Sequence, residues 1–116
     1  MTSPYNNLLV KHYYHHPVAN TAAVVTLAAP GSDLCWVIED ILFGFDSIPA
    51  AAKEFSIAFG GEAAIKIPIS SSDAKRVAPL GGLRGKANQE VVITLAADTG
   101  GAKGYLNAQC RSEYSS

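Results

Sequence analysis

Few residues in this sequence have the type and spacing that catalysis or metal binding requires. The three histidines, His12, His15 and His16, lie within five residues of one another near the start of the chain. If this segment is extended, His12 and His16 share one face and His15 lies on the other, because side chains alternate along a strand. A divalent metal would need further ligands, for instance at a symmetry axis where copies of the chain meet. We therefore expect no metal and no cofactor, with the imidazoles at an interface or in solvent.

Two further motifs resemble functional sites but lack essential parts. Residues 81–86, Gly-Gly-Leu-Arg-Gly-Lys, lack the terminal Gly-Lys-Ser/Thr of a phosphate-binding loop, and a predicted strand rather than a helix follows them. Glu39 and Asp40 are neighbours on a predicted strand, so they should point to opposite faces and cannot share a proton. Glu39 lies in an apolar run and needs a cationic partner, for which Arg84 and Lys66 are the candidates; the alternative is that the acidic pair faces solvent or forms a salt bridge between subunits.

The ligand set of the metal-binding cupins, the main class of enzymes built on a small β-barrel, is also missing. No His-x-His is followed by Glu and His at the required spacing. The histidines lie away from any predicted pocket, so no Ser-His-Asp or Cys-His arrangement can be assembled around them. We therefore predict that the protein is not an enzyme.

Composition points to a small domain that buries surface against other chains. The 116 residues fit one domain; 48% are hydrophobic and 16% are charged, compared with about 25% charged residues in an average chain. So few charges would cover a lone monomer poorly, which favours an oligomer. The two cysteines, Cys35 and Cys110, are too few for a disulfide scaffold, and we expect free, half-buried thiols.

The charge distribution and hydropathy exclude other partners. The net charge is −1 and the basic residues are scattered, which argues against nucleic acid as a partner. No apolar run approaches the about 20 residues of a membrane span, and no basic segment followed by an apolar one marks a secretion signal. We expect synthesis in a cytoplasm, without a membrane partner.

The strongest pattern in the chain is an eleven-residue sequence repeat that occurs twice, which we call the repeated phrase. Residues 19–29 (ANTAAVVTLAA) and residues 87–97 (ANQEVVITLAA) are identical at seven of eleven positions. Each copy is rich in β-branched residues and is followed by a turn that contains glycine, which is typical of a strand and its turn. The repeat predicts two equivalent strands in one β-domain.

Further strands fill the space between and around the repeats. Residues 54–59 and 64–69 alternate apolar and polar side chains on either side of Gly60-Gly61, which predicts a hairpin. Pro68 removes a ladder donor and indicates an edge strand or a bulge. The other predicted strands are the apolar run 35–45, a short strand within 77–83 that glycines interrupt, and a final strand over 102–110. About eight strands with turns between them predict an all-β fold, an antiparallel β-sandwich or jelly roll.

The chain divides into an N-terminal arm (residues 1–17), a jelly-roll domain (18–111) and a polar tail (112–116). The aromatic residues of the arm are costly to leave in water, so we interpret the segment either as an extended arm docked on a partner or as an edge strand of its own domain. The predicted partner contacts are Tyr5, Leu8, Leu9, His12, Tyr13, Tyr14 and His15. The predicted core contains Trp36, Ile38, Phe55, Ile57, Phe59 and Leu95.

The order of motifs is that of a known class of protein. Ala-Asn-x3-Val-x-Thr-Leu-Ala-Ala-Pro-Gly-Ser is followed by Trp-Val-Ile and Phe-Gly-Phe-Asp, and later by Pro-Leu-Gly-Gly-Leu-Arg-Gly, the second repeat and Gly-x2-Gly-Tyr-Leu-Asn. From Val18 to Cys110 this resembles small tailed-phage virion proteins with a trimeric, tumour-necrosis-factor-like jelly roll. Some of these are capsid decoration or cement proteins, and others belong to head or tail fibres. The N-terminal arm matches nothing in that class.

The resemblance implies a homotrimer that binds the major capsid protein at the surface of the virion and stabilises the capsid. Its action would be physical, through repeated burial of apolar surface. The alternative is a head- or tail-fibre module that binds a receptor or a sugar. Residues 46–53 and 70–77, two predicted loops, contain no aromatic residue, which argues against that alternative.

Overall fold

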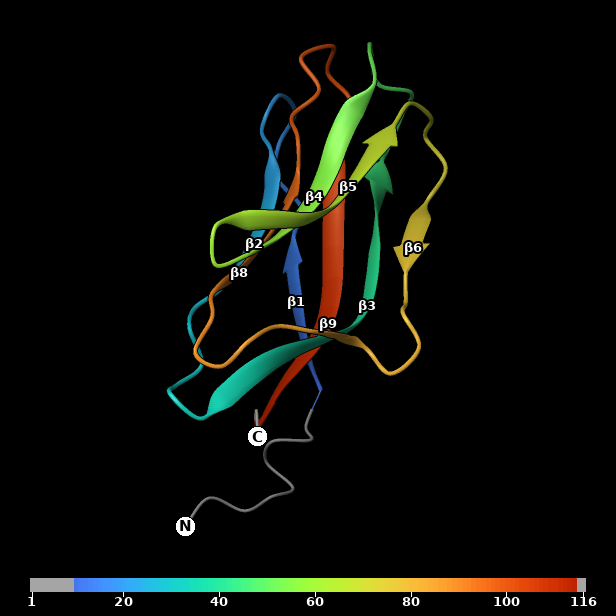
Figure 1. The fold of residues 1–116 in the computed structure, drawn as a ribbon. Helices are drawn as coiled ribbons and strands as arrows, with labels where there is room; N and C mark the ends of the chain where they lie inside the picture. The colour runs from blue at the N-terminus through green and yellow to red at the C-terminus, as the bar shows by residue number, and fades with distance from the viewer. Residues whose placement is uncertain (1–9, 115–116) are drawn as a thin grey trace.

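The computed structural model describes residues 10–114, which form nine β-strands and no helix (Figure 1). The strands are β1 (Lys11–His15), β2 (Ala23–Leu27), β3 (Leu34–Phe45), β4 (Lys53–Phe59), β5 (Glu62–Ile69), β6 (Lys75–Val77), β7 (Leu83–Arg84), β8 (Val91–Leu95) and β9 (Gly104–Tyr114). The predicted all-β class is confirmed.

The strands form two antiparallel sheets that pack face to face. Sheet A has the order β1-β9-β3-β6, with β7 also paired to β3, and sheet B has the order β2-β8-β4-β5. The pairing is nested around the β4–β5 hairpin: β3 pairs with β6 and β7, β2 with β8, and β1 with β9. Such nesting, with the first strand beside the last, is the arrangement of a jelly roll, which the sequence analysis predicted.

The two copies of the repeated phrase occupy equivalent places in this nested order and pair with each other. β2 lies antiparallel to β8, with Val25 opposite Ile93 at the centre of the ladder. The Ala-Asn that begins each copy is also structurally equivalent, since Asn20 and Asn88 have φ of 64° and 53°. Asparagine tolerates this left-handed conformation better than most residues. The repeat therefore encodes both the strands and the turns that lead into them.

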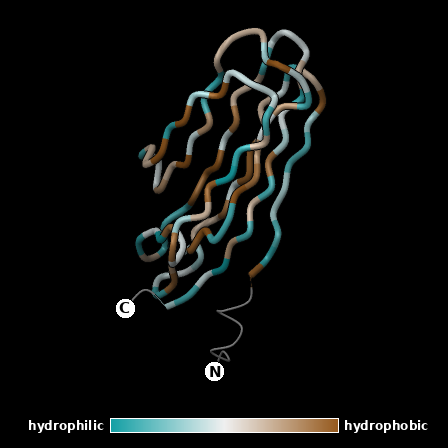
Figure 2. Tube along the Cα trace, turned by 90° about the vertical axis from the view of Figure 1, so that its right-hand side faces the viewer, coloured by the Kyte–Doolittle hydropathy of each residue, from teal (hydrophilic) through white to brown (hydrophobic). Residues whose placement is uncertain are grey.

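Alternating side chains from both sheets fill the core, and hydrophobic and hydrophilic residues alternate along the strands (Figure 2). Phe43 of sheet A and Phe55 of sheet B lie at its centre, with ring centroids 3.7 Å apart and planes 7° from parallel. Among the predicted core residues, four are fully buried: Ile38, Phe55, Ile57 and Leu95. Trp36 and Phe59 are partly buried and pack against this cluster.

Both ends of the predicted domain differ from the expected boundaries. Lys11–His15 pairs in register with β9, from Lys11 opposite Cys110 to His15 opposite Leu106, so this part of the predicted arm is an edge strand of sheet A. The predicted tail is wrong for residues 112–114, because β9 continues to Tyr114, which pairs with Leu34. The polar residues of this stretch continue the strand because β3 supplies a hydrogen-bonding partner over its whole length. Tyr5, Leu8 and Leu9 lie outside the described residues.

A bulge in β3 overturns the expected geometry of Glu39 and Asp40. The register between β3 and β9 shifts between Ile38 and Asp40. Ile38 and Ile41 are both fully buried, while the two acidic residues between them form ion pairs on the outer face of sheet A. An extra residue in one strand breaks the alternation of side chains, so two neighbours can face the same side.

The predicted strand over residues 77–83 is instead two short strands, β6 and β7, joined by a glycine turn. Gly81 and Gly82 have φ of 79° and 83°, which side chains with a Cβ rarely adopt. A Cβ on Gly82 would also lie 2.5 Å from Cγ1 of Val37. The turn passes that close to β3, which explains why Val37 is fully buried although it does not belong to the central core cluster.

Asp98 is a charged residue that is only 2% exposed, and it joins two loops at one end of the sandwich. Its carboxylate accepts hydrogen bonds from the backbone N–H groups of Ala50 and Ala102, each at 3.0 Å. Burial alone raises the pKa of this carboxyl, but backbone hydrogen bonds from Ala50, Ala102 and Gly100, with the charge of Lys53, outweigh it and hold the pKa below its ordinary value of 3.8. The ionised form is therefore the one that the fold stabilises.

We predict that Asp98→Asn lowers the melting temperature by several degrees at pH 7 and weakens its dependence on acid. Because the pKa is depressed in the folded state, the carboxylate stabilises the protein above about pH 4, and this contribution disappears as the pH falls through the folded pKa. Thermal unfolding followed by circular dichroism between pH 7 and pH 2 should show the two curves converging in acid. Asp73→Asn, at an exposed loop residue, should leave the melting temperature at pH 7 unchanged. If the melting temperatures of the wild type and Asp98→Asn instead fall in parallel between pH 7 and pH 2, the ionised form of Asp98 does not stabilise the fold.

Candidate binding surfaces

Three aromatic rings on the outer side of β1 and of the residue that follows it form a strip, which we call the ring strip: His12, Tyr14 and His16. Adjacent ring centroids lie 5.5 Å and 5.3 Å apart, and the rings are tilted rather than parallel. Tyr14 is 65% exposed. His12 and His16 share this face while His15 lies on the other side of the strand, as the sequence predicted. The strip is an exposed aromatic surface at the edge of sheet A.

The ring strip borders a groove on the outer face of sheet A. In the sheet register, Tyr14 lies opposite Asn107, which lies opposite Leu42, and His12 lies opposite Gln109, which lies opposite Asp40. The groove has a volume of about 340 Å³, and we call it the sheet A groove. Its lining consists of His12, Asp40, Leu42, Asn107 and Gln109.

The sheet A groove is rich in hydrogen-bonding groups without an excess of charge. Arg76 forms two parallel hydrogen bonds to Asp40, Nε to Oδ1 at 2.9 Å and Nη2 to Oδ2 at 2.8 Å. These bonds and the carboxylate charge raise the pKa of the guanidinium, and the pair leaves the groove with no net charge from its lining. Nε2 of His16 lies 3.0 Å from Oδ1 of Asn107, so this amide carbonyl already accepts from the ring strip.

The inward-facing residues of β1 have partners within the domain. Tyr13 packs edge-on against Trp36, with centroids 6.0 Å apart and planes at 88°. Nδ1 of His15 accepts a hydrogen bond from the backbone N–H of Val24, at 2.9 Å, and so links sheet A to the edge of sheet B. Of the partner contacts predicted within Lys11–His15, only His12 and Tyr14 therefore present their side chains to the outside.

A series of linked ion pairs lies on the outer face of sheet A, at the end where β7 pairs with β3. Glu39 pairs with Arg111, Arg111 with Glu113, and Glu113 with Arg84. The sequence analysis offered Arg84 or Lys66 as the partner of Glu39, and that prediction is wrong, because the partner comes from β9, the neighbouring strand. Since the chain of pairs links β3, β7 and β9, its role is to hold these strands together.

The two cysteines are buried and free of a disulfide, rather than half-buried as predicted. Nη1 of Arg84 lies 3.2 Å from Sγ of Cys35. Burial, and after it the charge of Glu39, raises the pKa of the Cys110 thiol to about 12. Because the thiolate is the nucleophilic form, Cys110 is not suited to covalent chemistry at neutral pH.

Within residues 10–114, histidine, cysteine, aspartate and glutamate side chains do not gather into a group of three that could hold a metal ion. No helix in this part of the chain is long and apolar enough to cross a membrane.

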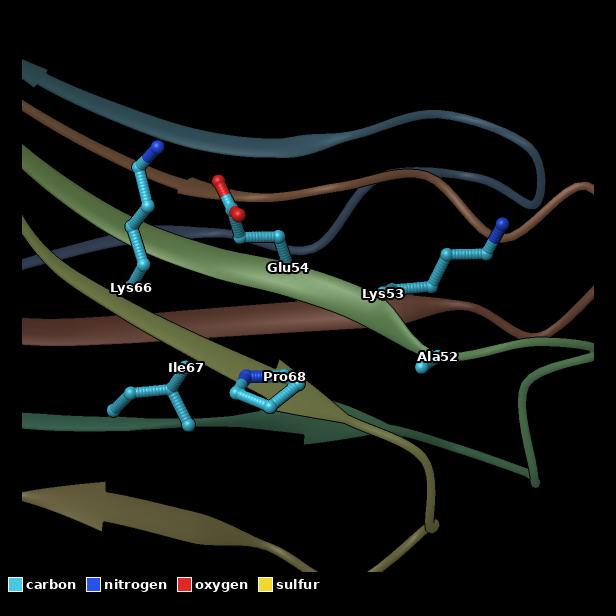
Figure 3. A pocket seen from close by; sticks show the side chains of 6 residues that line it. All are labelled: Ala52, Lys53, Glu54, Lys66, Ile67 and Pro68. Carbon is cyan, nitrogen blue, oxygen red and sulfur yellow. The ribbon is translucent and has the colours of Figure 1, made fainter.

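A second hollow, of about 400 Å³, lies on the β4–β5 hairpin and is lined by Ala52, Lys53, Glu54, Lys66, Ile67 and Pro68. Lys66 and Glu54 extend to the same side of the hairpin, whereas Ile67 extends to the other (Figure 3). Pro68 lies on β5, which is an edge strand as the sequence predicted. The hollow therefore combines charges of both signs at a sheet edge and lacks the exposed aromatic rings found beside the sheet A groove.

The outer face of sheet B differs from that of sheet A because its centre is uncharged. Two rows of side chains cross its first three strands: Val24, Thr94 and Ser56 in one row, and Thr26, Val92 and Ala58 in the other, while Lys66 lies opposite Ser56 on the fourth strand. Their neighbours along the strands point into the core, so these six residues face outward. We call them the uncharged face. Both copies of the repeated phrase contribute to it.

No family model and no curated protein matches the sequence of this chain. Among solved structures, it is similar to the Drosophila NLP core, whose structure is described in terms of pentamer formation and histone binding, with 14% identity over 87% of this chain and 96% of that chain (TM-score 0.50).

Two other solved structures are similar to this chain. Dimeric latent PorU from Porphyromonas gingivalis matches with 8% identity over 90% of this chain and 13% of that chain (TM-score 0.52). The CBM36-1 domain of a multidomain xylanase from the hindgut metagenome of Trinervitermes trinervoides matches with 9% identity over 84% of this chain and 73% of that chain (TM-score 0.45). At such identities the likenesses to the NLP core and PorU show the fold alone, and that fold is a β-sandwich.

Proposed function

We propose that this protein is a structural component of a tailed-phage virion, a capsid decoration protein that forms a homotrimer and stabilises the shell. The jelly-roll fold is compatible with this role, since viral capsid proteins use it widely, but a fold alone does not define a function. The proposal therefore depends on what the surface of the domain offers to other chains.

The uncharged face is the observation that carries the proposal. Six adjacent outward side chains on β2, β8 and β4 are uncharged, and all are small or β-branched. Surfaces that stay in water usually intersperse charges of both signs. Depletion of charge is instead the mark of the centre of a subunit interface. We assign the uncharged face to contacts between sister subunits.

Attachment to the shell is assigned to the start of the chain. The apolar residues Tyr5, Leu8 and Leu9 precede β1 and were predicted as partner contacts from the sequence. The major capsid protein is the proposed partner. Each copy needs only a modest apolar footprint, because a trimer that attaches at several points gains avidity from each of them.

We predict that the wild-type protein is a trimer in solution, with three times the mass of the 12.2 kDa chain. Thr94→Lys should convert it to a monomer. The lysine would bring a charge into the centre of the proposed interface, where an unpaired charge is costly. Light scattering after size-exclusion chromatography measures the mass. Thr99→Lys, the same substitution at an exposed turn, should remain a trimer. If the wild-type protein is a monodisperse monomer, the proposal of a trimer is wrong.

The virion itself tests the second half of the proposal. Quantitative mass spectrometry of purified particles gives the copy number relative to the major capsid protein. A decoration protein is present in hundreds of copies and a fibre protein in tens, whereas an enzyme need not be present. Absence from particles would eliminate both virion roles.

A further inference from the structure

We propose that the sheet A groove and the adjacent ring strip form a binding site for a neutral oligosaccharide. This site lies on the sheet opposite the uncharged face and shares no residue with it. The proposal is therefore independent of the trimer and of attachment to a capsid, and it concerns a second surface of the same domain.

The ring strip supplies the apolar contact that a sugar needs. One side of a pyranose presents C–H groups, which pack against the face of an aromatic ring, and tyrosine adds a hydroxyl at the edge of the same platform. Tyr14 is 65% exposed although it lies in a regular strand, and His12 and His16 extend the platform on both sides. With adjacent ring centroids 5.5 Å and 5.3 Å apart, the strip is about 11 Å long at most, which suits a short oligosaccharide better than a single sugar.

The groove beside the strip supplies hydrogen bonds of the kind that hydroxyl groups use. A sugar hydroxyl is both donor and acceptor, and the amide of Gln109 likewise offers both an N–H and a carbonyl, while Asn107, whose carbonyl accepts from His16, offers its N–H groups. Asp40 adds acceptor oxygens, and its position is fixed by the two hydrogen bonds from Arg76. Leu42, which is 42% exposed, gives the groove an apolar floor. The combination matches the mixed polar and apolar surface of a carbohydrate.

The same features disfavour other ligand classes. The lining contains no lysine or arginine, and Arg76, which is bound to the groove residue Asp40, is already paired, so the groove offers no excess positive charge for phosphate, sulfate or a sialic acid carboxylate. The groove lies across β1, β9 and β3, whose backbone groups pair with one another, so an extended peptide could not add itself there as a further strand. Recognition must therefore come from side chains, and the lining favours a ligand without a negative charge.

The test uses an array of unbranched gluco-, manno-, galacto- and xylopentaoses beside sialylated and sulfated oligosaccharides, followed by calorimetric titration with the tightest neutral pentaose. We expect the wild-type protein to bind at least one neutral pentaose. Tyr14→Ala should weaken binding at least tenfold, because it removes the centre of the platform. Gln109→Ala, at a second exposed position, should weaken it several-fold.

Tyr114→Ala is the matched control, because Tyr114 is 49% exposed on the same sheet but lies at the far end of β9. It should change the affinity less than twofold. Circular dichroism and solution mass should be the same for the wild type, Tyr14→Ala and Tyr114→Ala. Binding of Thr94→Lys with wild-type affinity would separate this site from the subunit interface. Failure to bind any neutral pentaose, binding of anionic sugars only, or wild-type affinity in Tyr14→Ala would each overturn the proposal.

Discussion

Phe55→Ala should lower the free energy of unfolding by about 3–5 kcal/mol, the cost of truncating a large aromatic residue in a closed core. Phe55 is fully buried, and its ring stacks on Phe43 across the two sheets. The substitution would remove both the apolar contact and the only ring that faces Phe43 in this stack. Since small domains are stable by about 5–15 kcal/mol, the variant should lose a large fraction of its stability. Urea denaturation followed by circular dichroism measures the loss.

Phe59→Ala provides the matched control. Phe59 lies four residues further along β4, on the same face, but it is only partly buried and packs at the margin of the core. Neighbouring side chains and water can fill more of the space it leaves, so its truncation should cost clearly less than that of Phe55. An equal or larger loss at Phe59 would show that the core is centred elsewhere than on the Phe43–Phe55 stack.

The sequence predicted the elements whose pattern is local. The repeated phrase marked β2 and β8, the alternation around Gly60-Gly61 marked the β4–β5 hairpin, and Pro68 marked an edge strand. Each of these depends only on residues close together in the chain, where side-chain period and turn chemistry act directly. The nested order then made the two copies of the repeat partners, which identical strands alone did not predict.

What the sequence did not reveal depends on pairing between distant segments. Arg111 is the partner of Glu39 because β9 lies beside β3 and because a bulge turns both acidic residues outward. No local pattern specifies the register between strands so far apart in the chain. For the same reason, the sequence predicted that His12 and His16 share a face and that Tyr14 is a partner contact, but it did not reveal the groove beside them. The alternation of polar Asn107 and Gln109 with apolar residues in the last strand was the available signal, but only the register places those amides beside Tyr14.

Deleting residues 1–16 should remove several kcal/mol of stability and leave a chain that aggregates, because β1 is part of the sandwich. The deletion breaks the β1–β9 ladder, removes the ring of Tyr13 from Trp36 and removes the hydrogen bond between His15 and Val24. A buried or half-buried large side chain contributes about 1.5–3 kcal/mol, and each lost hydrogen bond adds about 0.5–1.5 kcal/mol. The part of β9 that β1 covers, Leu106–Cys110, would also become an exposed edge, which favours association with other chains.

A shorter deletion separates the strand from the residues that precede it. A chain that begins at Val10 keeps all of β1 and every contact named above, so we expect its free energy of unfolding to stay within about 0.5 kcal/mol of that of the full chain. Urea denaturation and the soluble yield of the two truncated chains make the comparison. If the chain that begins at Pro17 unfolds at the same urea concentration as the full chain, β1 is a dispensable arm rather than a strand on which the fold depends. The two results together therefore decide between the two interpretations of the N-terminal segment that the sequence alone left open.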